Sequence, residues 1–124
     1  NNKNGQYITA NWFLKESNPE NGGLYVYPGT HRLPLLPAPH KKSYRENIDD
    51  NPGRQCEVPA EFKDKKIDII TKPSSVLFLN GNCIHGSYPN FSDYSRPYFT
   101  TCYITKGEKY IIGKNSKRIE VNFG

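Results

Sequence analysis

"SSVLFLNGNCIHGSYPNFSDYSRPYFTTCYI", residues 74–104, is the stretch that decides the fold, because two apolar runs flank a segment rich in turn formers. The first run ends at His85, and the second opens after Arg96, eleven positions later. Runs of this kind predict β-strands. If the two strands are antiparallel neighbours, the turn between them brings the imidazole and the guanidinium to the same end of a sheet.

Strands are also predicted on either side of this stretch. Residues 5–14, "GQYITANWFL", alternate between two faces, with Trp12 on one face and Phe13 on the other. Shorter strands are predicted over residues 23–29, 56–62 and 66–71. Residues 109–113 and 118–123 are predicted to form strands or a packed tail.

The composition supports one all-β domain over residues 1–124. Aromatic residues make up 13% of the chain, with nine Tyr and six Phe, and they suit half-buried pleated surfaces. Ten Pro and ten Gly favour short strands joined by turns. Together these features predict a sandwich or a barrel.

Charge and cysteine usage exclude several kinds of partner. The net charge of +5 is dispersed without a run of five like charges, which disfavours nucleic-acid binding. Three cysteines without CxxC spacing disfavour a disulfide framework or a zinc ribbon and indicate free thiols. No apolar stretch approaches a membrane span, and the polar start of the chain shows no signal peptide. We therefore predict a cytoplasmic protein with no membrane partner.

A lid-like loop is predicted over residues 31–55, because Pro and charged residues dominate there and the apolar residues follow neither a helix nor a strand periodicity. A short helix is predicted near residues 43–49. Loops on a rigid barrel often carry specificity, so this segment is a candidate lid over a small-molecule substrate. Its basic residues could meet an anionic substrate, and a solvated loop is an equal alternative: Arg32, Lys41, Lys42, Arg45 and Arg54.

His85 is a candidate metal ligand. It ends an apolar run that leads out of the predicted core, and Gly86 and Ser87 after it allow a ligand to approach the backbone closely. A neutral imidazole in such a place suits a divalent transition metal. A lone histidine at a strand end is otherwise an ordinary hydrogen-bonded residue.

Arg96 is a candidate carboxylate clamp, because its planar guanidinium binds carboxylates with two parallel hydrogen bonds. A surface ion pair with Asp93 or Glu108 is the alternative. With His85, it indicates a metal site that also binds an organic acid.

Two ordered motifs resemble the phytanoyl-CoA dioxygenase family of Fe(II)- and 2-oxoglutarate-dependent oxygenases. They are "NGGLYVYPGTHR" (residues 21–32) and "VLFLNGNCIHGSYPNFSDYSR" (residues 76–96), and "ITANW" (residues 8–12) matches a preceding strand. The resemblance extends over about residues 7–105, and this stretch is similar to the C-terminal part of the family's proteins.

The resemblance implies a double-stranded β-helix, a jelly-roll or cupin-like barrel. It implies that His85 is an iron ligand and that Arg96 binds the distal carboxylate of 2-oxoglutarate, assisted by Ser87. Trp12 would lie on the wall of the pocket. The implied reaction decarboxylates 2-oxoglutarate to succinate and hydroxylates a small organic substrate.

The chain departs from the family in its iron ligands. The family supplies a first histidine and an acid as H-x-D or H-x-E, and none of His31, His40 and His85 has that context. Three explanations compete: a truncated chain that lacks the early strands of the barrel, a catalytically inactive relative, and a halogenase-like relative. We expect truncation, and therefore no activity from these 124 residues alone.

Other kinds of site are weaker alternatives. A zinc site of His31, His40 and His85 is chemically acceptable, but two of the three residues lie in a turn and a loop. A nucleophilic pair of Cys83 and His85 has nothing to orient the base. The rival class is a β-sandwich that binds carbohydrate or protein through surface aromatic residues: Tyr25, Tyr27 and Tyr44.

Overall fold

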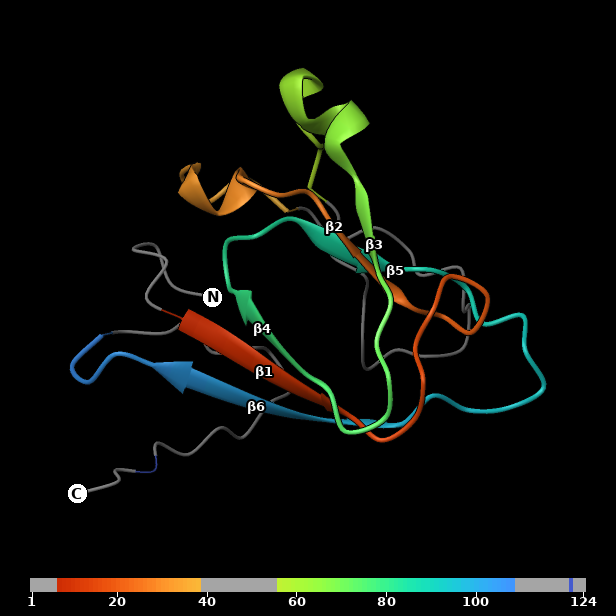
Figure 1. Cartoon of the computed structure of the whole chain (residues 1–124). Coiled ribbons are helices and arrows are strands. Elements are labelled where there is room, and N and C mark those ends of the chain that lie inside the picture. Colours follow the sequence, from red (N-terminus) through yellow and green to blue (C-terminus); the bar gives the residue numbers. More distant parts are fainter. Residues whose placement is uncertain (1–6, 39–55, 109–120, 122–124) are drawn as a thin grey trace.

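The computed structural model describes residues 7–38, 56–108 and 121, and within these ranges the chain is almost entirely β-structure. The strands form two three-stranded antiparallel sheets, in the orders β4-β1-β6 and β3-β2-β5 (Figure 1). The bounds are β1 Tyr7–Phe13, β2 Leu24–Val26, β3 Ile67–Ile69, β4 Val76–Asn80, β5 His85–Ser87 and β6 Tyr98–Ile104. The all-β prediction is confirmed, and the jelly-roll or cupin-like barrel stays a prediction.

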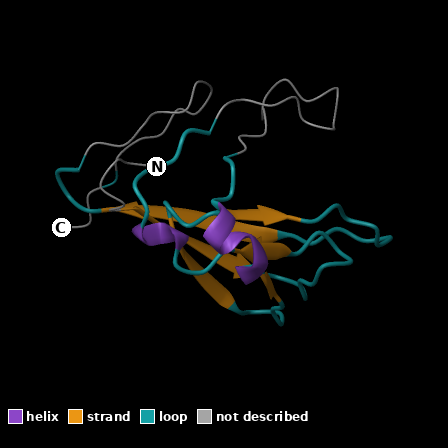
Figure 2. Cartoon of the chain, turned by 90° about the horizontal axis from the view of Figure 1, so that it is seen from above, coloured by secondary structure: helices purple, strands orange, loops and turns teal. Residues whose placement is uncertain are grey.

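Two 3-10 helices complete the described residues, η1 (Thr30–Arg32) and η2 (Ala60–Lys65). η1 follows the end of β2 and η2 precedes the start of β3, so both lie at that end of the β3-β2-β5 sheet (Figure 1), and Figure 2 shows the same elements from above. The predicted lid is described only over residues 31–38, which finish η1 and continue without regular secondary structure. None of the described helices is long and apolar enough to cross a membrane.

β1 is the central strand of its sheet, and one of its faces forms part of the core. Tyr7, Asn11 and Phe13 are buried, whereas Ile8 and Trp12 on the other face are exposed. The alternation predicted from the sequence is therefore present. The buried face is the one with the polar Asn11, whose side-chain oxygen accepts a hydrogen bond from Thr100 Oγ1 at 2.9 Å.

The opposite face of the β4-β1-β6 sheet is apolar and exposed. The register pairs Trp12 with Val76 on one side and Phe99 on the other, so side chains of three strands gather there. We call this set the apolar face: Ile8, Trp12, Val76, Phe78, Phe99 and Tyr103, each exposed by 45% or more.

The apolar run that ends at His85 was predicted to form one buried strand, over residues 74–86. This prediction is wrong, because the run is divided between the two sheets. β4 ends at Asn80, where a turn forms: the Asn80 carbonyl accepts a hydrogen bond from Cys83 N at 3.0 Å, and the Asn80 side chain accepts one from Asn82 N at 2.9 Å. Gly81 lies against the Tyr7 ring, where no side chain fits. β5 then begins at His85 in the other sheet.

Residues 56–62, predicted as a strand, are irregular over 56–59 and form the first half of η2 over 60–62. Pro59 explains this, because it has no N–H for a β-ladder and its fixed φ suits a helix start. Its carbonyl accepts a hydrogen bond from Phe62 N at 2.9 Å. The predicted strand over residues 66–71 is confirmed as β3. The helix near residues 43–49 and the strand over residues 109–113 lie outside the described residues, as does the strand over residues 118–123 apart from Val121.

Candidate functional site

A tight turn between β1 and β2 is the base of the candidate site. The Asn18 carbonyl accepts a hydrogen bond from Gly23 N at 2.7 Å, and Gly23 has no room for a side chain there. The fully buried Asn21 side chain accepts a hydrogen bond from Asn18 N and donates one to the Glu16 carbonyl, both at 2.9 Å. Gly22 has a φ of +82°, a backbone conformation that glycine adopts without strain.

β2 leaves this turn and pairs with β5, which carries two of the predicted site residues. Leu24 lies opposite Ser87, and Val26 lies opposite His85. Directly opposed residues share a face, so both candidate residues lie on the face that contains the buried Leu24. Gly86 between them faces the other way, where the Tyr25 ring fills the space a side chain would need.

The His85 imidazole has a defined tautomer. Its Nδ1 lies 2.8 Å from the carbonyl oxygen of Cys83. Because a carbonyl only accepts, Nδ1 carries the hydrogen and the neutral ring leaves the lone pair of Nε2 available. The side chain is exposed. This is the arrangement of a histidine that ligates metal through Nε2.

The Cys83 thiol does not fit a nucleophile. It is half-buried, and desolvation raises its pKa above the usual value, against a smaller lowering by its contact with Thr30. His85 contacts the backbone carbonyl of Cys83. The thiol therefore stays protonated near neutral pH, which argues against a Cys83–His85 pair.

Arg96 lies in an aromatic setting on the buried side of β1. Its guanidinium carbon is 5.9 Å from the centroid of the Phe13 ring and 5.0 Å from that of the Tyr98 ring. Nη2 donates a hydrogen bond to the Gly22 carbonyl, while Nε and Nη1 are buried without a hydrogen-bond partner. Arg96 is partly buried, and two buried donors without partners on a charged group are costly, so this guanidinium is suited to an anionic partner.

The predicted pairing of the strands next to His85 and Arg96 is wrong. β5 pairs with β2, whereas β6 pairs with β1 in the other sheet. The loop between them is instead fixed to the turn before β2: Phe91 N donates to the Glu20 carbonyl at 3.0 Å, and Asn21 and Asn90 form an isolated β-bridge.

The structure brings Ser87 beside His85 on β5, but it does not bring Trp12 to Arg96. Trp12 is on the apolar face, where its ring lies 6.3 Å from that of Phe99, whereas Phe13 faces Arg96. Sequence reasoning missed Phe13 and Gly22 as contacts of Arg96. It placed Tyr98, two residues after Arg96, on the same face of the predicted strand.

The described part of the chain does not contain a complete set of metal ligands. Residues 7–38, 56–108 and 121 contain no group of three His, Cys, Asp or Glu side chains that could hold a metal ion. His31 is exposed in η1, and His40 lies outside the described residues. These residues therefore do not make an iron site by themselves, and His85 is a single candidate ligand.

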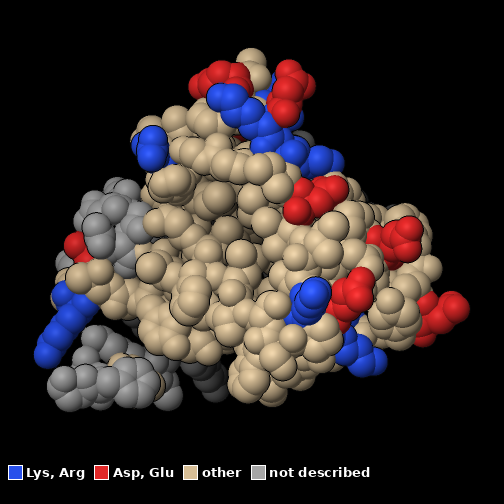
Figure 3. All heavy atoms as spheres, viewed as in Figure 1, with Lys and Arg blue, Asp and Glu red and all other residues tan. Residues whose placement is uncertain are grey.

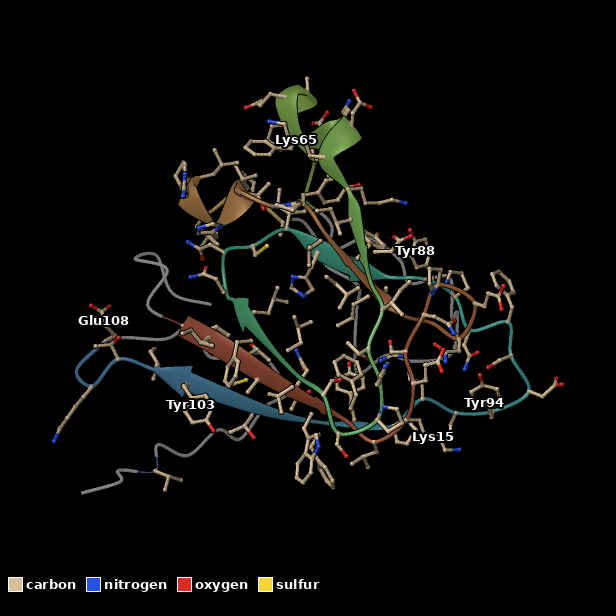
Figure 4. All side chains as sticks on the ribbon, viewed as in Figure 1. Lys15, Lys65, Tyr88, Tyr94, Tyr103 and Glu108 are labelled. Carbon is tan, nitrogen blue, oxygen red and sulfur yellow. The ribbon has the colours of Figure 1, made fainter. Side chains whose placement is uncertain are left out.

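An aromatic cluster lies on the other face of the β3-β2-β5 sheet. The centroids of the Tyr25 and Tyr27 rings lie 6.1 Å apart in an edge-on arrangement, and those of the Tyr25 and Tyr88 rings lie 5.0 Å apart with the rings tilted by 56°. Lys66 Nζ covers the Tyr25 and Tyr88 rings and donates to Tyr88 Oη at 2.7 Å, which in turn donates to Asp68 at 2.6 Å. Burial raises the pKa of Tyr25. Because Lys66 already covers the rings, this cluster gives little support to a carbohydrate platform; Tyr88 is labelled in Figure 4.

Charged side chains are sparse in the middle of the surface seen in Figure 3. They gather over η2 and around the edge that includes the loop after β5 (Figures 1 and 3).

Comparison with known proteins gives two findings. A family model described as phytanoyl-CoA dioxygenase matches residues 1–98, which include Trp12, His85, Ser87 and Arg96. The chain is also similar to an ectoine dioxygenase of Streptomyces avermitilis, with 28% identity over 99 residues. That match covers 75% of this chain and 34% of the relative, so the chain spans about a third of the relative's length.

Proposed function

The chain belongs to the phytanoyl-CoA dioxygenase family, and from this premise we propose that it forms part of an Fe(II)- and 2-oxoglutarate-dependent oxygenase. The proposed substrate is a small organic molecule, and the co-substrate 2-oxoglutarate is decarboxylated to succinate. Hydroxylation of the substrate is the reaction that we propose.

One observation carries the proposal: Arg96 Nε and Nη1 are buried and unpartnered. 2-Oxoglutarate has a carboxylate at the end remote from its keto group. A permanently charged guanidinium held by aromatic rings is a suitable partner for that carboxylate. Ser87 lies opposite Leu24 on the His85 side of β5 and is proposed to donate a hydrogen bond to the same carboxylate.

His85 is proposed as one iron ligand, through its free Nε2. Iron would supply the oxygen chemistry, and the two further protein ligands that the family provides as H-x-D or H-x-E are not among the described residues. The protein's own contribution at this position is a fixed ring: the Cys83 carbonyl holds Nδ1–H and so orients Nε2. Trp12 is left out of the proposed site, because it lies on the opposite face of β1 from Phe13.

The test is 2-oxoglutarate consumption by the full-length protein and its Arg96→Ala variant. Leaving a carboxylate unpaired in a desolvated pocket costs on the order of 3 kcal/mol. At about 1.4 kcal/mol per factor of ten, the KM for 2-oxoglutarate should rise at least about a hundredfold. Arg96→Lys should recover only part of the loss, because an ammonium cannot make a two-pronged contact.

Two results would contradict the proposal. An unchanged KM in Arg96→Ala would make Arg96 an ordinary structural cation. Full turnover in His85→Ala would remove His85 from the iron site. Affinity for a divalent metal should fall in His85→Ala and barely change in Arg96→Ala, so the two variants separate the metal from the co-substrate.

A further inference from the structure

We propose that the segment Asn21–Val26 is a positioning template that sets both anchors of the co-substrate, Arg96 and His85, relative to each other. The inference rests on the proposed function. It assigns a role to residues that touch neither metal nor co-substrate, and it explains how His85 of β5 and Arg96 of the loop before β6 are held in one arrangement.

The first step is the contact between Gly22 and Arg96. The Gly22 carbonyl accepts a hydrogen bond from Nη2, and the Phe13 and Tyr98 rings flank the guanidinium. A neutral carbonyl fixes the orientation of the group without neutralising its charge. A carboxylate in the same place would have bound the cation and removed its attraction for an anion.

The second step is the contact between β2 and β5. Tyr27 N donates to the Ile84 carbonyl at 2.9 Å, and Tyr88 N donates to the Gly23 carbonyl at 3.0 Å. These bonds bracket the three residues of β5, so the backbone of His85 and Ser87 is fixed from both ends. The same short segment thus binds the guanidinium at its start and the histidine strand along its length.

The third step is the backbone of Gly22. Its φ of +82° directs the carbonyl, and a Cβ at this position would lie 3.3 Å from Asn90 Cβ. An alanine would therefore strain the turn and move the carbonyl away from Arg96. Gly107 provides a matched control, because its φ is +84° and a Cβ there would meet no atom within 4 Å.

The experiment compares Gly22→Ala, Gly107→Ala, Arg96→Ala and the Gly22→Ala/Arg96→Ala double variant. The readouts are the dissociation constant of 2-oxoglutarate from calorimetry, and KM and kcat separately. Gly22→Ala should weaken 2-oxoglutarate binding at least about tenfold with little change in kcat, the size expected when a charged group loses one hydrogen bond. Gly107→Ala should bind as the wild type does, and the double variant should be no weaker than Arg96→Ala.

The outcomes separate the template from the proposed function. Binding that is unaffected by Arg96→Ala overturns the proposed function. If Arg96→Ala weakens 2-oxoglutarate binding but Gly22→Ala binds as tightly as Gly107→Ala, the template is overturned and the proposed function is not. If Gly22→Ala does not fold, Gly22→Asn replaces it, because asparagine tolerates positive φ. Its Cβ would still lie 3.3 Å from Asn90 Cβ, so this variant should bind 2-oxoglutarate more weakly than Gly107→Asn, and equal affinity overturns the template.

Discussion

Arg96 carries a charge that its described contacts leave uncompensated, since two aromatic rings and one neutral carbonyl surround it. The sequence predicted its role as a clamp but not its surroundings. Tyr98 could have been inferred from its spacing, whereas Phe13 comes from another strand and Gly22 from a distant turn. Contacts of this kind depend on how the sheets are arranged, which no local pattern contains.

The raised pKa of Cys83 gives a prediction on thiol reactivity. The thiolate is the reactive form, so a pKa raised above the ordinary value of 9.0 delays labelling of Cys83 to higher pH. The exposed Cys102 serves as the internal comparison. Peptide mapping after alkylation across a pH series should show Cys102 labelled well before Cys83. Faster labelling of Cys83 at neutral pH would show that its thiol is activated.

At the scale of elements, prediction from the sequence succeeded for most strands, failed for residues 56–62 and failed for the partners of the strands. β1, β2, β3 and β6 formed where alternation and β-branched or aromatic residues indicated strands. The division of residues 74–86 depends on Gly81 against the Tyr7 ring, which is a contact between strands. The burial of the Asn11 face of β1 likewise follows from the rest of the molecule, because an apolar face alone would have suggested the reverse.

The turn before β2 is predicted to depend on Asn21. Its fully buried side chain makes hydrogen bonds to Asn18 N and to the Glu16 carbonyl, and Asn21→Ala leaves both backbone groups without their partner. We expect the free energy of unfolding to fall by about 2 kcal/mol, measured by urea denaturation.

Asn82→Ala is the matched control for this prediction. The Asn82 side-chain oxygen is buried without a hydrogen-bond partner, so its removal should change the unfolding free energy much less. Equal losses in the two variants would show that the hydrogen bonds of Asn21 do not stabilise the turn.

At the scale of the whole molecule, the apolar face is a continuous exposed patch formed by three strands of the described residues. Six side chains of this size, each about half exposed, amount to on the order of 700 Å² of apolar surface, more than a typical monomer leaves open. We therefore expect the 124-residue chain by itself to self-associate and to bind the dye ANS. Sedimentation and dye fluorescence measure these two properties.

A charge on the apolar face should reduce both self-association and binding of the dye ANS. Phe78→Lys introduces it at the most exposed member, and Ile70→Lys is the control, because Ile70 is 71% exposed and lies outside this face. A sharp cooperative melt of the unmodified chain as a monomer, without dye binding, would contradict the prediction.

The loop from Tyr88 to Ser95 is held separately at its two sides. Phe91 is bound to the Glu20 carbonyl on one side, and on the other Arg96 is bound to Gly22 and the Pro97 carbonyl accepts from Leu14 N at 3.2 Å. The exposed Asp93 lies between these attachments. A protein cleaved at Asp93 is therefore expected to keep both anchors in place, because each side of the loop has its own attachments. The geometry of the site is therefore set by these hydrogen bonds, and the peptide chain through the loop tip only connects the two halves of the loop.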